Sequence, residues 1–219
     1  NGNSGYGTAI VGTVSGTSIS FGSPVVYTSS DANYVTATYD STNQKVVIAY
    51  QDVGNSNYGT AVVGTVSGTS ISFGTPVVFN TAYSVFEQAT FDSTNGKVVI
   101  AYQDGGNNYY GAAIVGTVSG TSISFGASTV FESDTCVPET IVYDPSNQKV
   151  VIAYVDNGNS NYATAVVGTV SGTSISFGTP VAITSSRFDY IVATYDSTNQ
   201  KIVFAYEDFG NSNYGTAIV

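Results

Sequence analysis

Histidine, methionine and tryptophan are absent from this sequence of 219 residues, and cysteine occurs once. Without histidine the chain lacks the usual general base and the commonest transition-metal ligand, so Ser-His-Asp and Cys-His arrangements are excluded. Cys136 cannot form an internal disulfide, and we expect it to be a passive loop or core residue. A pair of carboxylates could hydrolyse a glycoside, but the acidic residues repeat with the scaffold, which indicates structural roles. The sequence therefore predicts a protein that is not an enzyme.

Charged residues are also scarce, at 9%, and only five of them are basic, which gives a net charge of −10. Binding to nucleic acid needs lysine and arginine to neutralise phosphates. Four of the five basic residues occupy one repeat position in successive units, so we do not expect them to form a basic patch: Lys45, Lys97, Lys149 and Lys201. We therefore expect no nucleic acid and no anionic membrane as a partner. No apolar run approaches the ~20 residues of a membrane span.

The residues that abound are those that suit a pleated sheet, namely valine, isoleucine and threonine with 17 tyrosines and 11 phenylalanines. They recur in a unit of 52 residues that has no insertion or deletion, as Asp52, Asp104, Asp156 and Asp208 illustrate. The units are 1–52, 53–104, 105–156 and 157–208, and residues 209–219 repeat residues 1–11. We expect a single repeat domain over residues 1–219.

Each unit contains four strand patterns. In the copy that begins near Tyr34 they cover residues 35–39, 45–50, 60–66 and 70–79. The second, KVVIAY, is apolar throughout and predicts a strand covered on both faces. Prolines in the fourth (Pro24, Pro76 and Pro180) predict an outer edge strand. Four-stranded antiparallel units of this length are typical of blades, so the sequence predicts an all-β protein, a β-propeller with four blades or part of a longer array. Stacked solenoid sheets and a parallel β-helix are the alternatives.

One stretch of the unit changes almost completely between copies, at residues 28–36, 80–88, 132–140 and 184–192. We predict variable loops there, on the same side of the sheets as the DxGNSNY loops. Binding residues concentrate on loops held by a rigid scaffold, although neutral drift is the alternative explanation. The predicted ligand-binding face consists of Asp31, Tyr34, Tyr83, Phe86, Glu87, Asp134, Glu139, Arg187, Phe188, Asp189 and Tyr190.

The DxGNSNY loop is the best candidate for a metal, because its oxygen ligands suit Ca²⁺. The candidate carboxylates are Asp52, Asp104, Asp156 and Asp208. The loop lacks the dense carboxylates of an EF-hand, and an Asx turn that satisfies its own backbone is the favoured role. We therefore expect no cofactor. Asp40, Asp92, Asp144 and Asp196 are predicted to bond the backbone of the YDSTNQK turns.

The units, written DSTNQKVVIAYQDVGNSNYGTAVVGTVSGTSISFGTPVVF, resemble repeats in predicted virion or tail-associated surface proteins of marine bacteriophages. The resemblance covers the whole chain. It implies an extracellular or virion-surface location and a role in attachment to a receptor or glycan. It supplies no catalytic or ligand residues.

Two functions are consistent with these observations. The leading hypothesis is a non-catalytic binding module that meets a cell-surface or glycan ligand on the variable face. The alternative is a structural subunit of a filament, joined to copies of itself by exchange of terminal strands. It is motivated by residues 1–11 and 209–219, which are near-copies of one strand. The first residue is Asn1, so we also expect a processed product or a piece of a longer array.

Overall fold

The structure, a computed structural model, describes residues 5–219, apart from the side chain of Asp189. It is all-β, as predicted, and the strands follow the 52-residue period. Each unit contains a long strand, a strand of eight residues, a strand of ten residues and a short strand. The long strands are β4 (Val25–Asp40), β8 (Val77–Asp92), β12 (Thr129–Asp144) and β16 (Val181–Asp196). The strands of eight residues are β5 (Lys45–Asp52), β9 (Lys97–Asp104), β13 (Lys149–Asp156) and β17 (Lys201–Asp208).

The remaining strands form the hairpins and the two ends of the molecule. The ten-residue strands are β6 (Tyr58–Ser67), β10 (Tyr110–Ser119) and β14 (Tyr162–Ser171). Each ends in a hairpin with a short strand: β7 (Ser70–Phe73), β11 (Ser122–Phe125) or β15 (Ser174–Phe177). Three strands precede the first four-stranded unit, namely β1 (Tyr6–Ala9), β2 (Gly12–Ser15) and β3 (Ser18–Phe21), and the last strand is β18 (Tyr214–Ile218).

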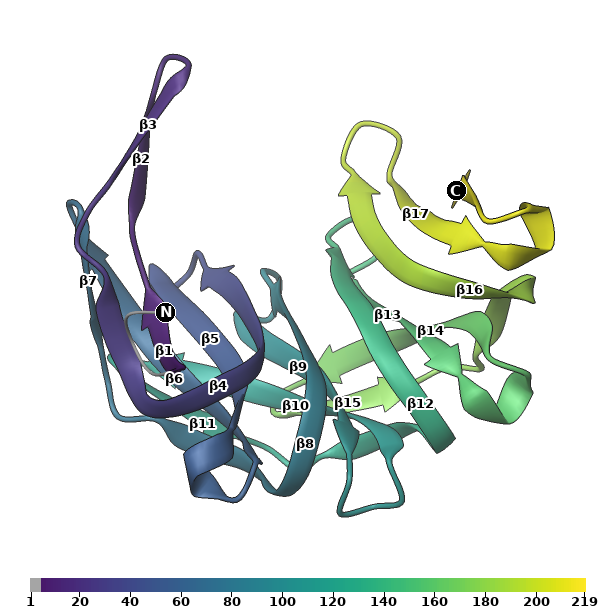
Figure 1. Cartoon of the computed structure of the whole chain (residues 1–219), viewed down its shortest axis with the longest axis horizontal. Coiled ribbons are helices and arrows are strands. Elements are labelled where there is room, and N and C mark those ends of the chain that lie inside the picture. Colours follow the sequence, from purple (N-terminus) through teal and green to yellow (C-terminus); the bar gives the residue numbers. More distant parts are fainter. Residues whose placement is uncertain (1–4) are drawn as a thin grey trace.

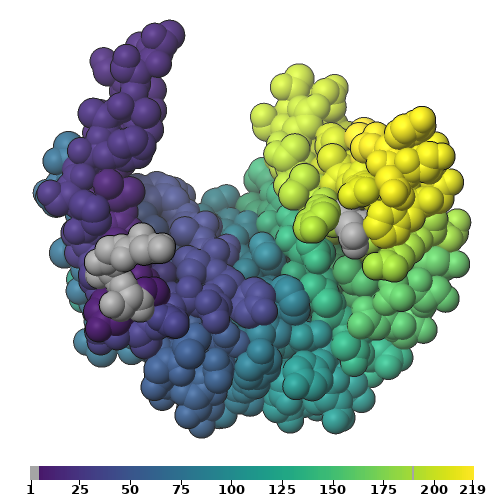
Figure 2. All heavy atoms as spheres, in the orientation of Figure 1, coloured from purple at the N-terminus to yellow at the C-terminus, as the bar shows by residue number. Residues whose placement is uncertain are grey.

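Antiparallel pairing joins all four units into one continuous sheet, in the order β1-β4-β5-β6-β8-β9-β10-β12-β13-β14-β16-β17-β18. The strands β7, β11 and β15 pair with β6, β10 and β14, and β2 and β3 form a separate hairpin. The units curve into an arch, and a hollow separates the first hairpin from the last unit (Figures 1 and 2). Within residues 5–219 the sheet is open, with β1 and β18 at the two ends of the order.

Each long strand belongs to two units. The first half of β8 pairs with β6 of the preceding unit, at Ala61↔Val77, and its second half pairs with β9, at Asp92↔Lys97. The change of partner occurs around a bulge between Val85 and Gln88. A four-stranded unit of the structure therefore consists of the second half of β8, then β9 and β10, with the outer position shared by β11 and the first half of β12. These structural units are offset from the sequence repeats and are counted from the one that begins in β4, so the unit just described is the second.

The long strands correct two predictions. The variable stretches are not loops, because they lie inside β4, β8, β12 and β16 and keep ladder pairing on both sides of the bulge. The predicted fourth strand, 70–79, is in fact two strands that are separated at Gly74. A Cβ at Gly74 would lie 1.9 Å from the carbonyl oxygen of Thr121, so the backbone of the next hairpin approaches too closely for any side chain.

The hydrophobic core lies between neighbouring units. Ala61 and Val63 of the first unit cluster with Val98 and Ile100 of the second, and all four side chains are buried. The apolar KVVIAY strand is covered on both faces, as predicted, since Val99 and Ala101 pack towards the third unit. Apolar burial at about 25 cal/mol per Å² makes these contacts between units the main source of stability.

The YDSTNQK turns are fixed by their aspartates, which confirms the predicted role. The Asp92 carboxylate accepts from the backbone nitrogens of Thr94 and Asn95, both at 3.0 Å, and from the Asn95 side chain at 2.7 Å. The same three bonds recur at Asp40, Asp144 and Asp196.

Short 3₁₀ turns are the only helical elements in the described part of the chain: η1 (Val53–Asn55), η2 (Asn157–Asn159) and η3 (Phe209–Asn211). None of the helices found between residues 5 and 219 is long and apolar enough to span a bilayer.

Candidate binding face

The variable stretches lie beside the DxGNSNY loops, as the sequence predicted. The Ser30 hydroxyl donates to the Asp52 carboxylate, and the Ser186 hydroxyl donates to the Asp208 carboxylate at 2.6 Å. On the strand ladder, Ala32 is opposite Asp52 and Phe188 is opposite Asp208. The side chains that differ between units therefore emerge next to loops that are nearly constant.

The bulges carry a row of ring-bearing residues, which we call the bulge row: Tyr34, Phe86, Pro138 and Tyr190. Three of the four have positive φ, at 49° for Tyr34, 59° for Phe86 and 55° for Tyr190. This left-handed conformation suits glycine or asparagine and is uncommon for a bulky residue. Proline cannot adopt it, and in β12 the register shift falls between Pro138 and Thr140.

The bulge row presents rings at two places. Tyr34 is exposed, and its ring packs against that of the half-buried Phe86 with a centroid separation of 4.8 Å. Tyr190 is 78% exposed. Pro138 lies between them and is buried. The structure therefore brings together Tyr34 and Phe86 and leaves Tyr190 as a separate ring on β16.

A second row lies three residues earlier in each long strand, and we call it the loop row: Asp31, Tyr83, Thr135 and Arg187. Tyr83 makes an edge-to-face contact with Tyr109, at 6.4 Å between centroids. The Arg187 guanidinium carbon lies 5.2 Å from the centroid of the Phe209 ring, a cation–π geometry.

Tyr109 and Phe209 were missed by the sequence reasoning. Both belong to the DxGNSNY loops, for which the sequence predicted only an Asx turn or a metal site. Departures from that pattern could have identified them, because Tyr109 stands where other units have Asn57 or Asn161, and Phe209 stands where the first unit has Val53.

Two of the predicted ligand-binding residues point into the core, which corrects their assignment. Phe188 is buried against Tyr206, with the ring centroids 6.3 Å apart. Glu87 is 1% exposed, and neither of its carboxylate oxygens has a hydrogen-bond partner among the described residues. Burial raises the pKa of Glu87 to about 7, although its own backbone and the nearby Ser84 hydroxyl partly offset this rise. Neither side chain is available to a ligand on the surface.

The other predicted acidic residues do not converge. Asp31 on β4 and Asp134 on β12 are exposed, and Glu139 on β12 is half-buried. The backbone nitrogen of Asp134 donates to Glu132 at 3.1 Å. Asp189 pairs with Glu207 through its backbone, and its side chain lies outside the described part of the structure.

The four candidate metal ligands accept hydrogen bonds that stabilise the DxGNSNY loops. Asp104 accepts from the Asn80 side chain and from the Gly106 nitrogen, both at 3.0 Å, and Asp156 accepts from the Asn159 nitrogen at 3.0 Å. Asp52 and Asp208 accept from the serines described above. Over the residues that the structure describes, no group of three or more His, Cys, Asp and Glu residues could hold a metal ion.

Cys136 is a core residue, which is one of the two predicted possibilities. It is buried next to Phe131 and Tyr154, and burial raises the pKa of its thiol. Its carbonyl oxygen accepts from the Gln103 side chain at 2.7 Å, so the residue links two units through its backbone.

No protein-family model matches this sequence, and comparison with curated proteins finds no significant similarity.

Proposed function

We propose that this chain is a non-catalytic binding module that attaches to a receptor or glycan from an extracellular or virion-surface position. The observation that carries the proposal is the left-handed backbone at three aromatic residues of the bulge row. A bulky residue in this region costs of order 1–3 kcal/mol, and such strain clusters at binding and active sites. Glycine would relieve it, yet three units have an aromatic residue in this conformation.

The chemistry of the bulge row suits a ligand with flat apolar faces. Tyr34 with Phe86, and Tyr190 farther along, offer ring surface with hydroxyl groups at its edge, and exposed tyrosines are typical of recognition surfaces. Tyr83 and Arg187 of the loop row add a second line of contacts. Two separate ring sites on one molecule also favour a repeating ligand such as a polysaccharide, because linked contacts strengthen one another.

The test removes the exposed rings without disturbing the backbone. The double variant Tyr34→Gly/Tyr190→Gly should fold, because glycine accepts both φ values. Its affinity for the glycan or bacterial cell that binds the unaltered chain best in an array should fall at least tenfold, about 1.4 kcal/mol.

The matched control is Tyr39→Ala/Tyr214→Ala, which removes two exposed tyrosines outside the bulge row. It should bind like the unaltered chain. Equal affinity of the Gly variant and the unaltered chain would contradict the proposal, as would the absence of any bound glycan or cell.

We also infer that the four-stranded units are blades of a β-propeller. Three features support this inference: the constant unit length, the packing of each unit on the next, and the curvature of the arch. Chains with additional 52-residue units, imaged by electron microscopy, distinguish the possibilities. Blades close into a ring around a channel, whereas solenoid units extend into a superhelix.

A further inference from the structure

The hairpin of β2 and β3 has the same sequence as three other hairpins but a different environment. Residues 12–21 read GTVSGTSISF, as do residues 64–73, 116–125 and 168–177. All residues of β2 and β3 are exposed, including Ile19 at 55%, whereas its copy Ile123 is 3% exposed. Figure 1 shows this hairpin projecting alone from the arch.

The internal hairpins show what such a hairpin packs against. Val118 and Ile123 belong to the cluster between the first two units, and Phe125 packs against it. The equivalent side chains of the projecting hairpin are Val14, Ile19 and Phe21, which are all exposed. The hairpin therefore carries the apolar contacts of an interface between units without the surface that normally receives them.

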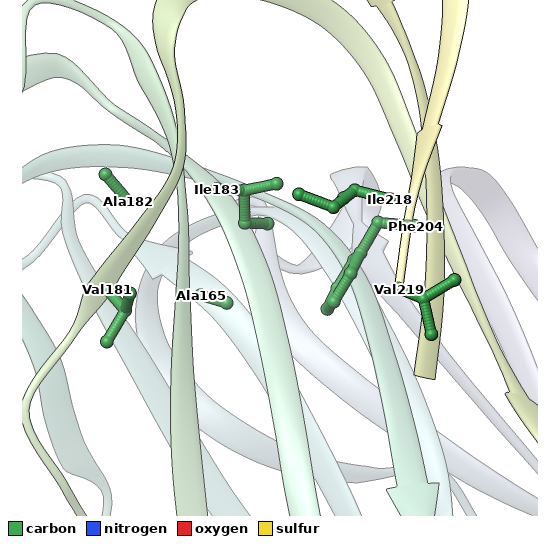
Figure 3. A pocket seen from close by; sticks show the side chains of 7 residues that line it. All are labelled: Ala165, Val181, Ala182, Ile183, Phe204, Ile218 and Val219. Carbon is green, nitrogen blue, oxygen red and sulfur yellow. The ribbon is translucent and has the colours of Figure 1, made fainter. Parts of the chain in front are cut away.

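That surface exists at the other end of the molecule. An apolar cavity of about 230 Å³ lies between β14, β16, β17 and β18, and Figure 3 shows Ile183, Phe204 and Ile218 facing one another across it. Five lining residues are copies, two units on, of residues in or against the cluster that receives Val118 and Ile123. Ala165, Val181, Ile183, Phe204 and Ile218 correspond to Ala61, Val77, Phe79, Ile100 and Ile114.

The outer face of the last unit is uncovered in the same way. Ala205 on β17 and Ala217 on β18 are exposed, whereas their copies Ala101 and Ala113 are fully buried against the next unit. The last unit therefore has both a cavity that a hairpin would fill and a face that a following unit would cover.

The strand registers allow one added molecule to fill the cavity and to cover the exposed face at the same time. Residues 6–11 and 214–219 have the same sequence, YGTAIV. β1 pairs with β4 in the register that β6 uses with β8, and β18 pairs with β17 in the register that β6 uses with β5. A strand with this sequence can therefore pair with β17 of one molecule along one edge and with β4 of a second molecule along its other edge. β6 pairs in the same way with β5 and β8.

We propose that β1 of a second copy of this chain replaces β18 beside β17, and that the hairpin at residues 12–21 of that copy packs into the cavity. The exchanged strand has the same sequence, so its ladder is preserved, and burial of Val14, Ile19 and Phe21 drives the association. The contact is heterologous and joins molecules head to tail. It is independent of the proposed ligand and of the bulge row.

The test uses one variant on each side of the contact in the chain of residues 1–219. Ile19→Asp alters an exposed hairpin residue, and Val181→Asp alters a cavity residue that is 66% exposed, so both should fold. In analytical ultracentrifugation the unaltered chain should form oligomers that grow with concentration. Each variant alone should be a monomer, with the dissociation constant raised at least hundredfold.

Mixing the two variants tests the head-to-tail geometry. The Val181→Asp chain keeps an intact hairpin and the Ile19→Asp chain keeps an intact cavity, so the mixture should form a dimer with one copy of each and nothing larger. Tyr109→Asp, at an exposed position in the loop between β9 and β10 of an internal unit, lies outside the contact and should assemble like the unaltered chain. A monomeric unaltered chain, an Ile19→Asp variant that still assembles, or a mixture that stays monomeric would each overturn the proposal.

Discussion

The turn at Asp40 and the bulge at Tyr34 both recur in every unit, but they are conserved in different ways. All four copies of the turn keep the same aspartate and the same hydrogen bonds. All four copies of the bulge keep one extra residue at this place in the long strand and replace almost every side chain. The turn is specified by a side chain that bonds its own loop, whereas the bulge is specified by strands on either side that require one extra residue. The turn therefore constrains its own sequence, whereas the bulge leaves its side chains free to vary.

The largest expected effect comes from the turn. Asp92→Ala removes three hydrogen bonds from a buried carboxylate and leaves two backbone nitrogens without their acceptor, so unfolding free energy should fall by about 4 kcal/mol. Asp196→Ala removes the same bonds at a solvent-exposed turn, where water can replace the lost acceptor, so the unfolding free energy should fall by much less. Denaturant titration of both variants measures the difference. Equal losses would show that burial does not set the strength of the turn.

A smaller effect is expected at Glu87, which lies in the variable stretch beside the bulge. Its folded pKa of about 7 lies above the usual 4.5, so the folded state binds the proton more tightly than the unfolded state does. Stability should therefore rise as the pH is lowered from about 7 towards 4.5, by at most about 3 kcal/mol. Above pH 7 this contribution is absent, because the folded state must then bury a charged carboxylate.

Glu87→Gln provides the control for this titration. It has nearly the same shape but does not titrate, so melting temperatures measured between pH 5 and 8 should lose most of their slope. An unchanged slope would assign the pH dependence to other carboxyl groups.

The smallest effect concerns the backbone strain at the bulge row. Tyr190→Gly should be more stable than Tyr190→Ala by about 1 kcal/mol, because alanine retains the unfavourable left-handed φ of 55° and glycine does not. At Val192, an exposed position of the same strand without positive φ, the order should reverse, with alanine more stable than glycine. Chemical denaturation of the four variants gives the comparison. The same order at both positions would remove the strain argument for the bulge row.

These contrasts also explain how much the sequence could predict. The period, the covered KVVIAY strand and the aspartate turns follow from residues that repeat, and the structure confirms them. The long strands could not be predicted, because segments such as TSSDANYVT lack apolar alternation and their strand conformation comes from neighbouring ladders. The burial of Glu87 and Phe188 was missed for the same reason, since a bulge reverses which side chains face the core.

The sharing of each long strand by two units has a consequence for how this protein can change in length. Val85 and Val137 occupy equivalent points of β8 and β12, one repeat apart. If Val85 were followed directly by Pro138, so that the 52 residues 86–137 were lost, every ladder would find a copy of its original partner in the same register. Unequal recombination between repeats in the gene would therefore yield shorter or longer arches that fold by the same rules. The number of repeats can therefore change by one whole unit at a time during evolution, without passing through a misfolded intermediate.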